Sequence, residues 1–282
     1  MQEDRSSDTA LGVATIRAVH QLIDELPHLL DDPVSPLLLG DDALRRIREM
    51  PGQYESIRSR ALRSHVVLRS RFAEDELARA AVSGIRQFIS LGAGYDTFSF
   101  RQPDWARAFK IVEVDHPATQ SAKIELMRRA GIKKPRNVEF VPLDLESGDL
   151  RASLAGSSLS LALPTFVACL GVLAYLRPET VCKTFQSIAG MAKGSEFVFA
   201  FAPNQGEGQR GNREFMTTAE RAAAHGEPWL TRFGVEELKQ ELMKSGFGNV
   251  TFLSPTEAEE CYYKGRQDLP APKKARICHA VV

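Results

Sequence analysis

Apolar residues follow two different rhythms along the chain. From Asp8 to about Ala81 they recur at helical spacing, and the first such stretch ends at Pro27. After Gly84 short apolar runs alternate with amphipathic stretches, which is typical of strands that alternate with helices. The pattern therefore predicts a helical N-terminal addition over residues 1–83 and an α/β domain over residues 84–282.

The second part predicts seven strands and the helices between them. Strands are expected at residues 86–91, 109–114, 137–143, 164–170, 195–202, 249–255 and 274–282, and helices at 117–131, 177–192 and 233–247. Nearly continuous apolar strands joined by helices indicate a mostly parallel, Rossmann-like sheet covered on both faces. A short turn-rich segment joins the last two strands, so an antiparallel edge strand is expected. The polar, glycine-rich insertion at residues 203–232 follows the fifth strand, in the position of a lid.

Composition narrows the class of protein. The 282 residues include 36 Lys plus Arg and 36 Asp plus Glu, so no basic excess argues for a nucleic-acid partner. The N-terminus lacks the apolar core of a signal peptide, and no apolar run is long enough to cross a membrane. The four cysteines lack the spacing of metal ligands. We expect a cytoplasmic monomer or homodimer with reduced thiols, no metal and no membrane or nucleic-acid partner.

A glycine loop follows the first strand, in "FISLGAGYDTFSF". Gly92 and Gly94 let the backbone turn tightly and pass close to a ligand. About 20 residues later, Glu113 and Asp115 close the second strand, at the distance where an acid meets a ribose diol in such folds. Asp144 follows the third strand, where it could accept a hydrogen bond from an adenine amine, with Leu145 packing on the base. Together these groups indicate a nucleoside ligand.

The residues of the glycine loop favour a nucleoside ligand without phosphate over a dinucleotide. A dinucleotide needs its pyrophosphate received by a bare helix N-terminus, and Tyr95 and Asp96 oppose that. S-adenosylmethionine carries no phosphate, and its sulfonium and ammonium groups suit an acidic loop. S-adenosylmethionine is therefore favoured over a nicotinamide dinucleotide, which would also require a third glycine that the loop lacks.

Five segments in this order resemble the leucine carboxyl methyltransferase family: "RSRFAEDEL", "FISLGAGYDTFSFR", "VEVDHPATQSAK", "VPLDLES" and "LGVLAYLRPE". Within the family they are most similar to bacterial O-methyltransferases of polyketide or other secondary metabolism. The resemblance implies a class I methyltransferase fold, S-adenosylmethionine as methyl donor and S-adenosylhomocysteine as product. It also implies a helical cap, residues 1–83, that contributes to the donor and acceptor pockets.

The resemblance also implies roles for individual residues. Arg71 of "RSRF" would clamp the methionine carboxylate of the donor, although other arginines crowd the same stretch, and Arg17 would lie near the donor. The remaining expected donor contacts are Gly92, Ala93, Gly94, Asp96, Thr97, Glu113, Asp115, His116, Asp144, Leu145, Leu170 and Gly171. Two positions depart from the family, because Phe98 replaces a frequent arginine and Leu170 a frequent glutamate.

The acceptor is left open by the sequence. A carboxylate is already ionised near neutral pH and needs no base, whereas a phenol or alcohol would benefit from one. His116, Tyr175, His225 and Tyr262 are the candidates, and Tyr175 is the one assigned here, with a core aromatic as the competing interpretation. The predicted function is methyl transfer to a carboxylate or hydroxyl of a small molecule. The alternative is a family member that binds the donor but has lost catalysis.

Overall fold

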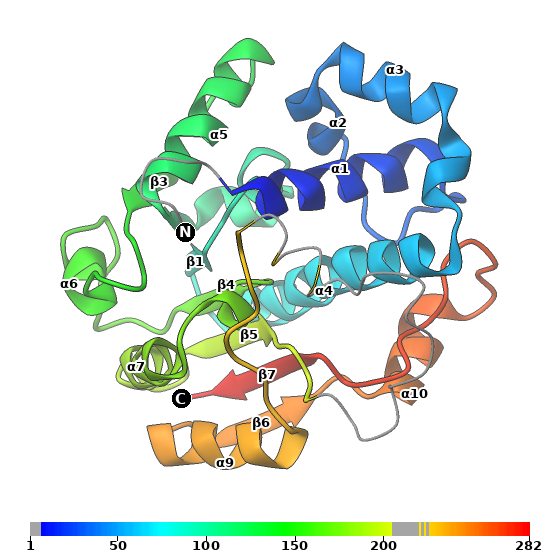
Figure 1. The fold of residues 1–282 in the computed structure, drawn as a ribbon. Coiled ribbons are helices and arrows are strands. Elements are labelled where there is room, and N and C mark those ends of the chain that lie inside the picture. The colour runs from blue at the N-terminus through cyan, green and yellow to red at the C-terminus, as the bar shows by residue number, and fades with distance from the viewer. Residues whose placement is uncertain (1–6, 205–219, 221–222, 224–225) are drawn as a thin grey trace.

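The computed structural model describes residues 7–204, 220, 223 and 226–282 and contains a seven-stranded sheet flanked by helices (Figure 1). The strands are β1 (Gln87–Leu91), β2 (Lys110–Asp115), β3 (Val138–Pro142), β4 (Phe166–Cys169), β5 (Glu196–Ala200), β6 (Asn249–Phe252) and β7 (Ile277–Val281). Their order is β3-β2-β1-β4-β5-β7-β6. The first five strands pair in parallel, and β7 runs antiparallel to both β5 and β6. The predicted α/β class, the strand count and the antiparallel edge pairing are confirmed.

The strand order reverses between β1 and β4. Strands β1, β2 and β3 extend the sheet in one direction, and the chain then crosses back to place β4 on the other side of β1. Connections that leave β1 and β4 in opposite directions open a crevice at their carboxyl ends, where ligands of open α/β sheets bind. The glycine loop after β1 lies at this point.

Helices cover both faces of the sheet. The 26-residue helix α4 (Ile57–Val82) packs on β4 and β5 and supplies most of the helical side of one core. The short α6 (Leu150–Ala155), α7 (Pro178–Ala189) and α9 (Val235–Ser245) supply the helical side of the other. Helix α5 (Pro117–Arg129) contacts β3. The shorter elements are η2 (Phe98–Phe100), η3 (Asp104–Ala108), η4 (Leu173–Tyr175), α10 (Pro255–Ala258) and the π-helical turn η5 (Glu259–Tyr263).

The N-terminal addition consists of α1 (Asp8–Ile23), α2 (Val34–Leu39), α3 (Asp41–Glu49) and the 3-10 turn η1 (Pro51–Tyr54), followed by α4. Ser7 caps α1 by accepting a hydrogen bond from Ala10 N, and α1 packs on α2 and α4. Figure 1 shows α1 lying above the sheet, near the carboxyl end of β1. The first helix is therefore placed over the crevice.

The two ends of the insertion after β5 are hydrogen-bonded to each other. Asn204 N donates to Phe233 O at 3.0 Å, and Phe233 N donates to Ala202 O at 3.0 Å. Most of residues 203–232 lie outside the described residues, including His225, but residues 226–232 are described. Among the described residues, no helix combines the length and the apolar character needed to cross a membrane.

Candidate functional site

A cavity of about 450 Å³ opens at the carboxyl ends of the central strands, a size typical of small-molecule sites. Its floor comes from the loops after β1, β2, β3 and β4, and its roof from the first turns of α1 and from residues 226–230. Most of the residues predicted from the sequence line it: Arg17, Gly92, Ala93, Gly94, Asp96, Asp115, His116, Asp144, Leu145, Leu170, Gly171 and Tyr175. Arg71, Thr97 and Glu113 do not.

The glycine loop is shaped by the strand beside it. Gly92 and Gly94 have φ values of +66° and +51°, a region that side chains rarely adopt. The end of β2 holds the turn, because Val114 O accepts hydrogen bonds from Gly92 N at 2.8 Å and from Ala93 N at 3.1 Å. A methyl group at Gly92 would collide with the Val172 side chain. The glycines are thus required by both backbone conformation and close packing.

Asp115 closes the loop from the next strand. Its Oδ1 accepts a hydrogen bond from His116 N at 2.6 Å, and its Oδ2 accepts one from Gly94 N. Burial raises the pKa of this carboxyl, although the backbone N–H groups of Gly94 and His116 oppose the shift. The carboxylate is therefore held at the cavity wall by two backbone donors.

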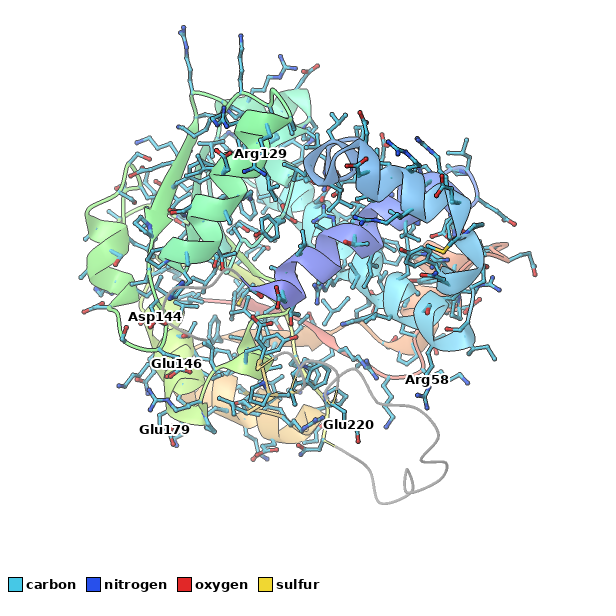
Figure 2. The ribbon with its side chains drawn as sticks, turned by 45° about the horizontal axis from the view of Figure 1, so that its top comes forward. Arg58, Arg129, Asp144, Glu146, Glu179 and Glu220 are labelled. Carbon is cyan, nitrogen blue, oxygen red and sulfur yellow. The ribbon has the colours of Figure 1, made fainter. Side chains whose placement is uncertain are left out.

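Asp144 holds the turn after β3. Its Oδ1 accepts from Glu146 N at 3.0 Å and its Oδ2 accepts from Ser147 Oγ at 2.9 Å, and Asp144 and Glu146 lie together in Figure 2. Glu146 is in turn bound by Arg177, whose Nε lies 2.7 Å from Glu146 Oε2. Asp144 and Leu145 both line the cavity.

Glu113 is not part of this site, which corrects the expectation that both acids of β2 face the ligand. Only the strand end at Asp115 reaches the cavity, and Glu113 lies two residues, about 6.6 Å, farther back along the strand. There α5 covers it, and Lys123 Nζ binds Glu113 Oε2 at 2.5 Å with both side chains 1% exposed. Glu113 forms a buried ion pair in the core.

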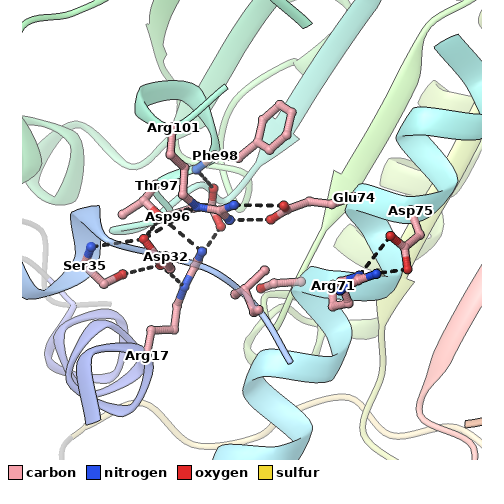
Figure 3. A network of polar contacts seen from close by, with 12 residues as sticks. Arg17, Asp32, Ser35, Arg71, Glu74, Asp75, Asp96, Thr97, Phe98 and Arg101 are labelled. Carbon is pink, nitrogen blue, oxygen red and sulfur yellow. Dashed lines mark hydrogen bonds and ion pairs between the residues drawn. The ribbon is translucent and has the colours of Figure 1, made fainter. Parts of the chain in front are cut away.

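The arginine of α4 that lines the cavity is Arg69 rather than Arg71. Residues two apart on an α-helix point about 200° apart, so only one of them can face the cavity. Arg71 is 44% exposed, binds Asp75 at 2.9 Å and donates to Leu29 O at 3.2 Å, away from the Arg17–Asp96 contact in Figure 3. Arg69 is buried and lines the cavity.

Arg69 has no partner for its charge within the described part of the chain. Its buried Nε lacks a hydrogen-bond acceptor there, and its guanidinium lies against Gly171. Burial lowers the pKa of Arg69 to about 10. The helical spacing of the sequence held a usable signal, since Arg69 shares its face with apolar Val66 and Ala73, whereas Arg71 precedes Asp75 by one turn. An unpaired buried guanidinium is suited to a carboxylate ligand.

Arg17 connects the N-terminal helices to the glycine loop. Its Nε binds Asp32 at 2.8 Å, its Nη1 binds Asp96 at 2.5 Å, and its Nη2 donates to Thr97 Oγ1 at 3.1 Å (Figure 3). Thr97 is fully buried inside this network, which is why it does not reach the cavity. Burial alone would raise the pKa of Asp96, but nearby Arg17 and other cations outweigh it and hold the pKa well below its usual range. Asp96 therefore remains ionised at the cavity wall.

The network also accounts for Phe98, which stands where relatives often carry arginine. The Phe98 ring is buried and packs edge-on against Phe88, with the ring centroids 5.3 Å apart. Arg101, three residues later, provides a cation, which binds Glu74 at 2.9 Å and lies 6.0 Å from the centre of the Phe98 ring. The aromatic residue thus belongs to the core beneath the loop.

The roof joins segments that are far apart in the sequence. Thr9 N, in the first turn of α1, donates to Glu227 Oε2 at 3.2 Å. Leu230 N donates to Ala174 O at 2.7 Å, which ties residues 226–230 to the loop after β4. Glu227 and Thr9 both line the cavity, and neither was predicted, because nothing in the sequence connects two positions 218 residues apart.

The candidate bases do not all lie at the cavity. Tyr175 lines the cavity and meets the ring of Trp229 edge-on, with 6.5 Å between centroids. Burial raises the pKa of Tyr175, which makes it a poor proton acceptor at neutral pH. Tyr262 lies elsewhere, where it donates to Asp75 at 3.1 Å, and His225 is outside the described residues. Within the described ranges, no group of three or more metal-ligating side chains occurs.

Comparisons with known proteins give one matching family model and relatives that align along most of the chain. The leucine carboxyl methyltransferase family model matches residues 10–189. The chain is 29% identical over 306 residues to Bacillus subtilis YktD, a provisionally assigned S-adenosyl-L-methionine-dependent methyltransferase, covering 100% of this chain and 99% of YktD. It is 30% identical to a similarly assigned protein of Mycobacterium marinum, covering 79% of this chain and 72% of the relative.

Solved structures support the same fold. A DUF574 family protein from Streptomyces avermitilis superposes with a TM-score of 0.56 at 16% identity, covering 95% of this chain and 96% of that chain. A provisionally assigned methyltransferase from Thermobifida fusca superposes with a TM-score of 0.55 at 16% identity, covering 99% of this chain and 96% of that chain.

Proposed function

The chain belongs to the leucine carboxyl methyltransferase family and is an S-adenosyl-L-methionine-dependent methyltransferase, and on that premise we propose that it methylates an oxygen of a small molecule. One observation carries the proposal: a cavity gathers two acids held by hydrogen bonds, Asp115 and Asp144, and the buried guanidinium of Arg69, which has no partner among the described residues. These groups complement the three polar parts of the donor, which are its carboxylate, its ribose and its adenine.

The residues present fit the donor. Arg69 would receive the methionine carboxylate, because its buried Nε has no acceptor among the described residues. Asp115 would accept the ribose hydroxyl protons, and Asp144 would accept from the adenine amine. Gly92 and Gly94 allow the methionine half to approach the backbone, since neither carries a side chain. The ionised Asp96 favours a cationic group nearby.

The donor supplies a methyl group activated by a positively charged sulfur. The protein contributes by positioning the reactants, because an in-line displacement is accelerated mainly by holding nucleophile, carbon and leaving group on one line. The roof to which Thr9 and Glu227 belong would enclose the reacting atoms. Residues 1–83 would act as a cap on the donor and acceptor pockets, and residues 203–232 as a lid that shapes the acceptor side.

The test is direct. Calorimetry should detect binding of S-adenosyl-L-methionine or S-adenosyl-L-homocysteine to the purified protein. A screen of carboxylic and phenolic metabolites with the donor, read by mass, should then find a gain of one methyl group on oxygen. Absence of donor binding, or methyl transfer to nitrogen or carbon alone, would refute the proposal.

A further inference from the structure

Some of the charged side chains that line the cavity are bound by other side chains of the protein, and others are not. Arg17 is bound by Asp32 and Asp96, and Glu146 is bound by Arg177. Under the proposed function, on which the following inference rests, the donor engages Arg69, Asp115 and Asp144. Among the described residues of the roof, the remaining charged side chain is Glu227, which is negative.

Glu227 is held in place by its backbone surroundings. Its Oε2 accepts a hydrogen bond from Thr9 N, one of the N–H groups in the first turn of α1 that have no partner within the helix. Gly226 before it has a φ of +80°, and Leu230 after it is tied to Ala174. No described residue donates a hydrogen bond to the other carboxylate oxygen, Oε1.

The surroundings of Glu227 are largely apolar. The nearby roof and wall are formed by Ala10 and Val13 of α1, by Tyr175 and Leu176 after β4, and by Leu230. Such walls suit a small aromatic or aliphatic acceptor. A carboxylate acceptor would have to enter an apolar site beside a like charge, which is unfavourable.

From this arrangement we infer that the acceptor is a neutral, largely apolar molecule with a hydroxyl group, and that Glu227 Oε1 binds that hydroxyl and takes its proton. As the acceptor oxygen bonds to the methyl carbon, the carbon–sulfur bond breaks and its electron pair stays on sulfur. The O–H bond breaks in the same step, and its proton passes to Glu227 and then to water. Glu227 is thereby assigned as the general base.

The substrate class is tested with three matched probes: 4-propylphenol, 4-propylbenzoic acid and 4-propylaniline. The wild-type protein with the donor should methylate the phenol and leave the acid and the amine unchanged, as read by mass. Calorimetry on the protein loaded with S-adenosyl-L-homocysteine should detect binding of the phenol but not of the acid. Methylation of the acid or of the amine, or no methylation of the phenol, would overturn the inference.

The residue is tested by two substitutions and a control. Glu227→Gln retains an oxygen for Thr9 N but cannot take a proton, so kcat for the phenol should fall about 100-fold with little change in KM. Glu227→Ala should also lower the melting temperature of the protein without ligand, because Thr9 N loses its acceptor. Glu237→Gln is the matched control, since Glu237 accepts from Gly234 N at 3.1 Å outside the cavity.

The outcomes separate this inference from the proposed function. Unchanged kcat in Glu227→Gln would remove Glu227 as the base, and an equal loss in Glu237→Gln would indicate a general effect of losing a carboxylate. In either case donor binding by the wild type would still support the proposed function. Loss of donor binding in the wild type would refute the proposed function itself.

Discussion

Replacing Arg69 by methionine should separate donor binding from folding. The side chain is buried without a partner for its charge among the described residues, and burial lowers its pKa well below the ordinary value, to about 10. A shift of that size corresponds to about 3 kcal/mol of unfavourable burial. Arg69→Met removes this cost, so the protein without ligand should melt no lower than the wild type.

Arg69→Met should, in contrast, weaken donor binding. Removing one partner of a buried, hydrogen-bonded charge pair costs about 2–5 kcal/mol, and a loss of about 3 kcal/mol raises Kd about 100-fold. Titration calorimetry with S-adenosyl-L-homocysteine measures this directly, because the product retains the carboxylate.

Arg71→Gln is the control, since Arg71 binds Asp75 on the exposed side of the same helix. Its effect on Kd should be less than about twofold, because exposed ion pairs contribute about 0–1 kcal/mol and this one is outside the cavity. Equal Kd values for Arg69→Met and the wild type, or an equal loss in Arg71→Gln, would refute the assignment of the carboxylate to Arg69.

Four further substitutions test the rest of the site. Asp115→Asn should weaken donor binding about 10-fold or more in calorimetry. Glu113→Gln should leave Kd unchanged and lower the melting temperature, because Lys123 is left buried without its partner. The reverse pattern would mean that the ribose acid is misassigned. Gly171→Ala places a methyl group against the Arg69 guanidinium at a φ of +84°, so Kd should rise about 10-fold, and unchanged Kd would contradict this geometry. The pKa of Asp96 is lowered on folding from its ordinary 3.8, so its stabilising contribution is complete above about pH 5 and is lost as the pH falls below about 4. Denaturant unfolding should therefore show a shallower fall in stability over that range for Asp96→Asn than for the wild type, and parallel curves would be evidence against an ionised Asp96.

Much of the fold follows from local pattern. Short apolar runs and amphipathic stretches have different periods, and each period can be recognised within a few residues. Gly92, Asp115 and Asp144 could be brought together from the sequence for a related reason. Each lies at or just after the end of a parallel strand, and the carboxyl ends of parallel strands meet at one edge of the sheet.

Other features depend on which way a side chain points. Arg69 and Arg71 belong to one helix and carry the same charge, and only the packing of α4 on the sheet decides that Arg69 is buried. Glu113 and Asp115 belong to one strand. Because β2 ends at Asp115, that acid lines the cavity, whereas α5 covers Glu113, which forms an ion pair in the core. In both pairs a shift of two residues changes the role completely.

The contacts least accessible to sequence are those between distant segments. Thr9 meets Glu227 across 218 residues, and Arg17 of α1 meets Asp96 of the glycine loop across 79. The sheet and the strand-end residues of the cavity could be predicted from the sequence, because they depend on local periodicity and on the geometry common to parallel sheets. The charge of Arg69, which has no partner among the described residues, and the place of Glu227 on the roof could be found only in the folded chain, because each depends on which distant groups surround it.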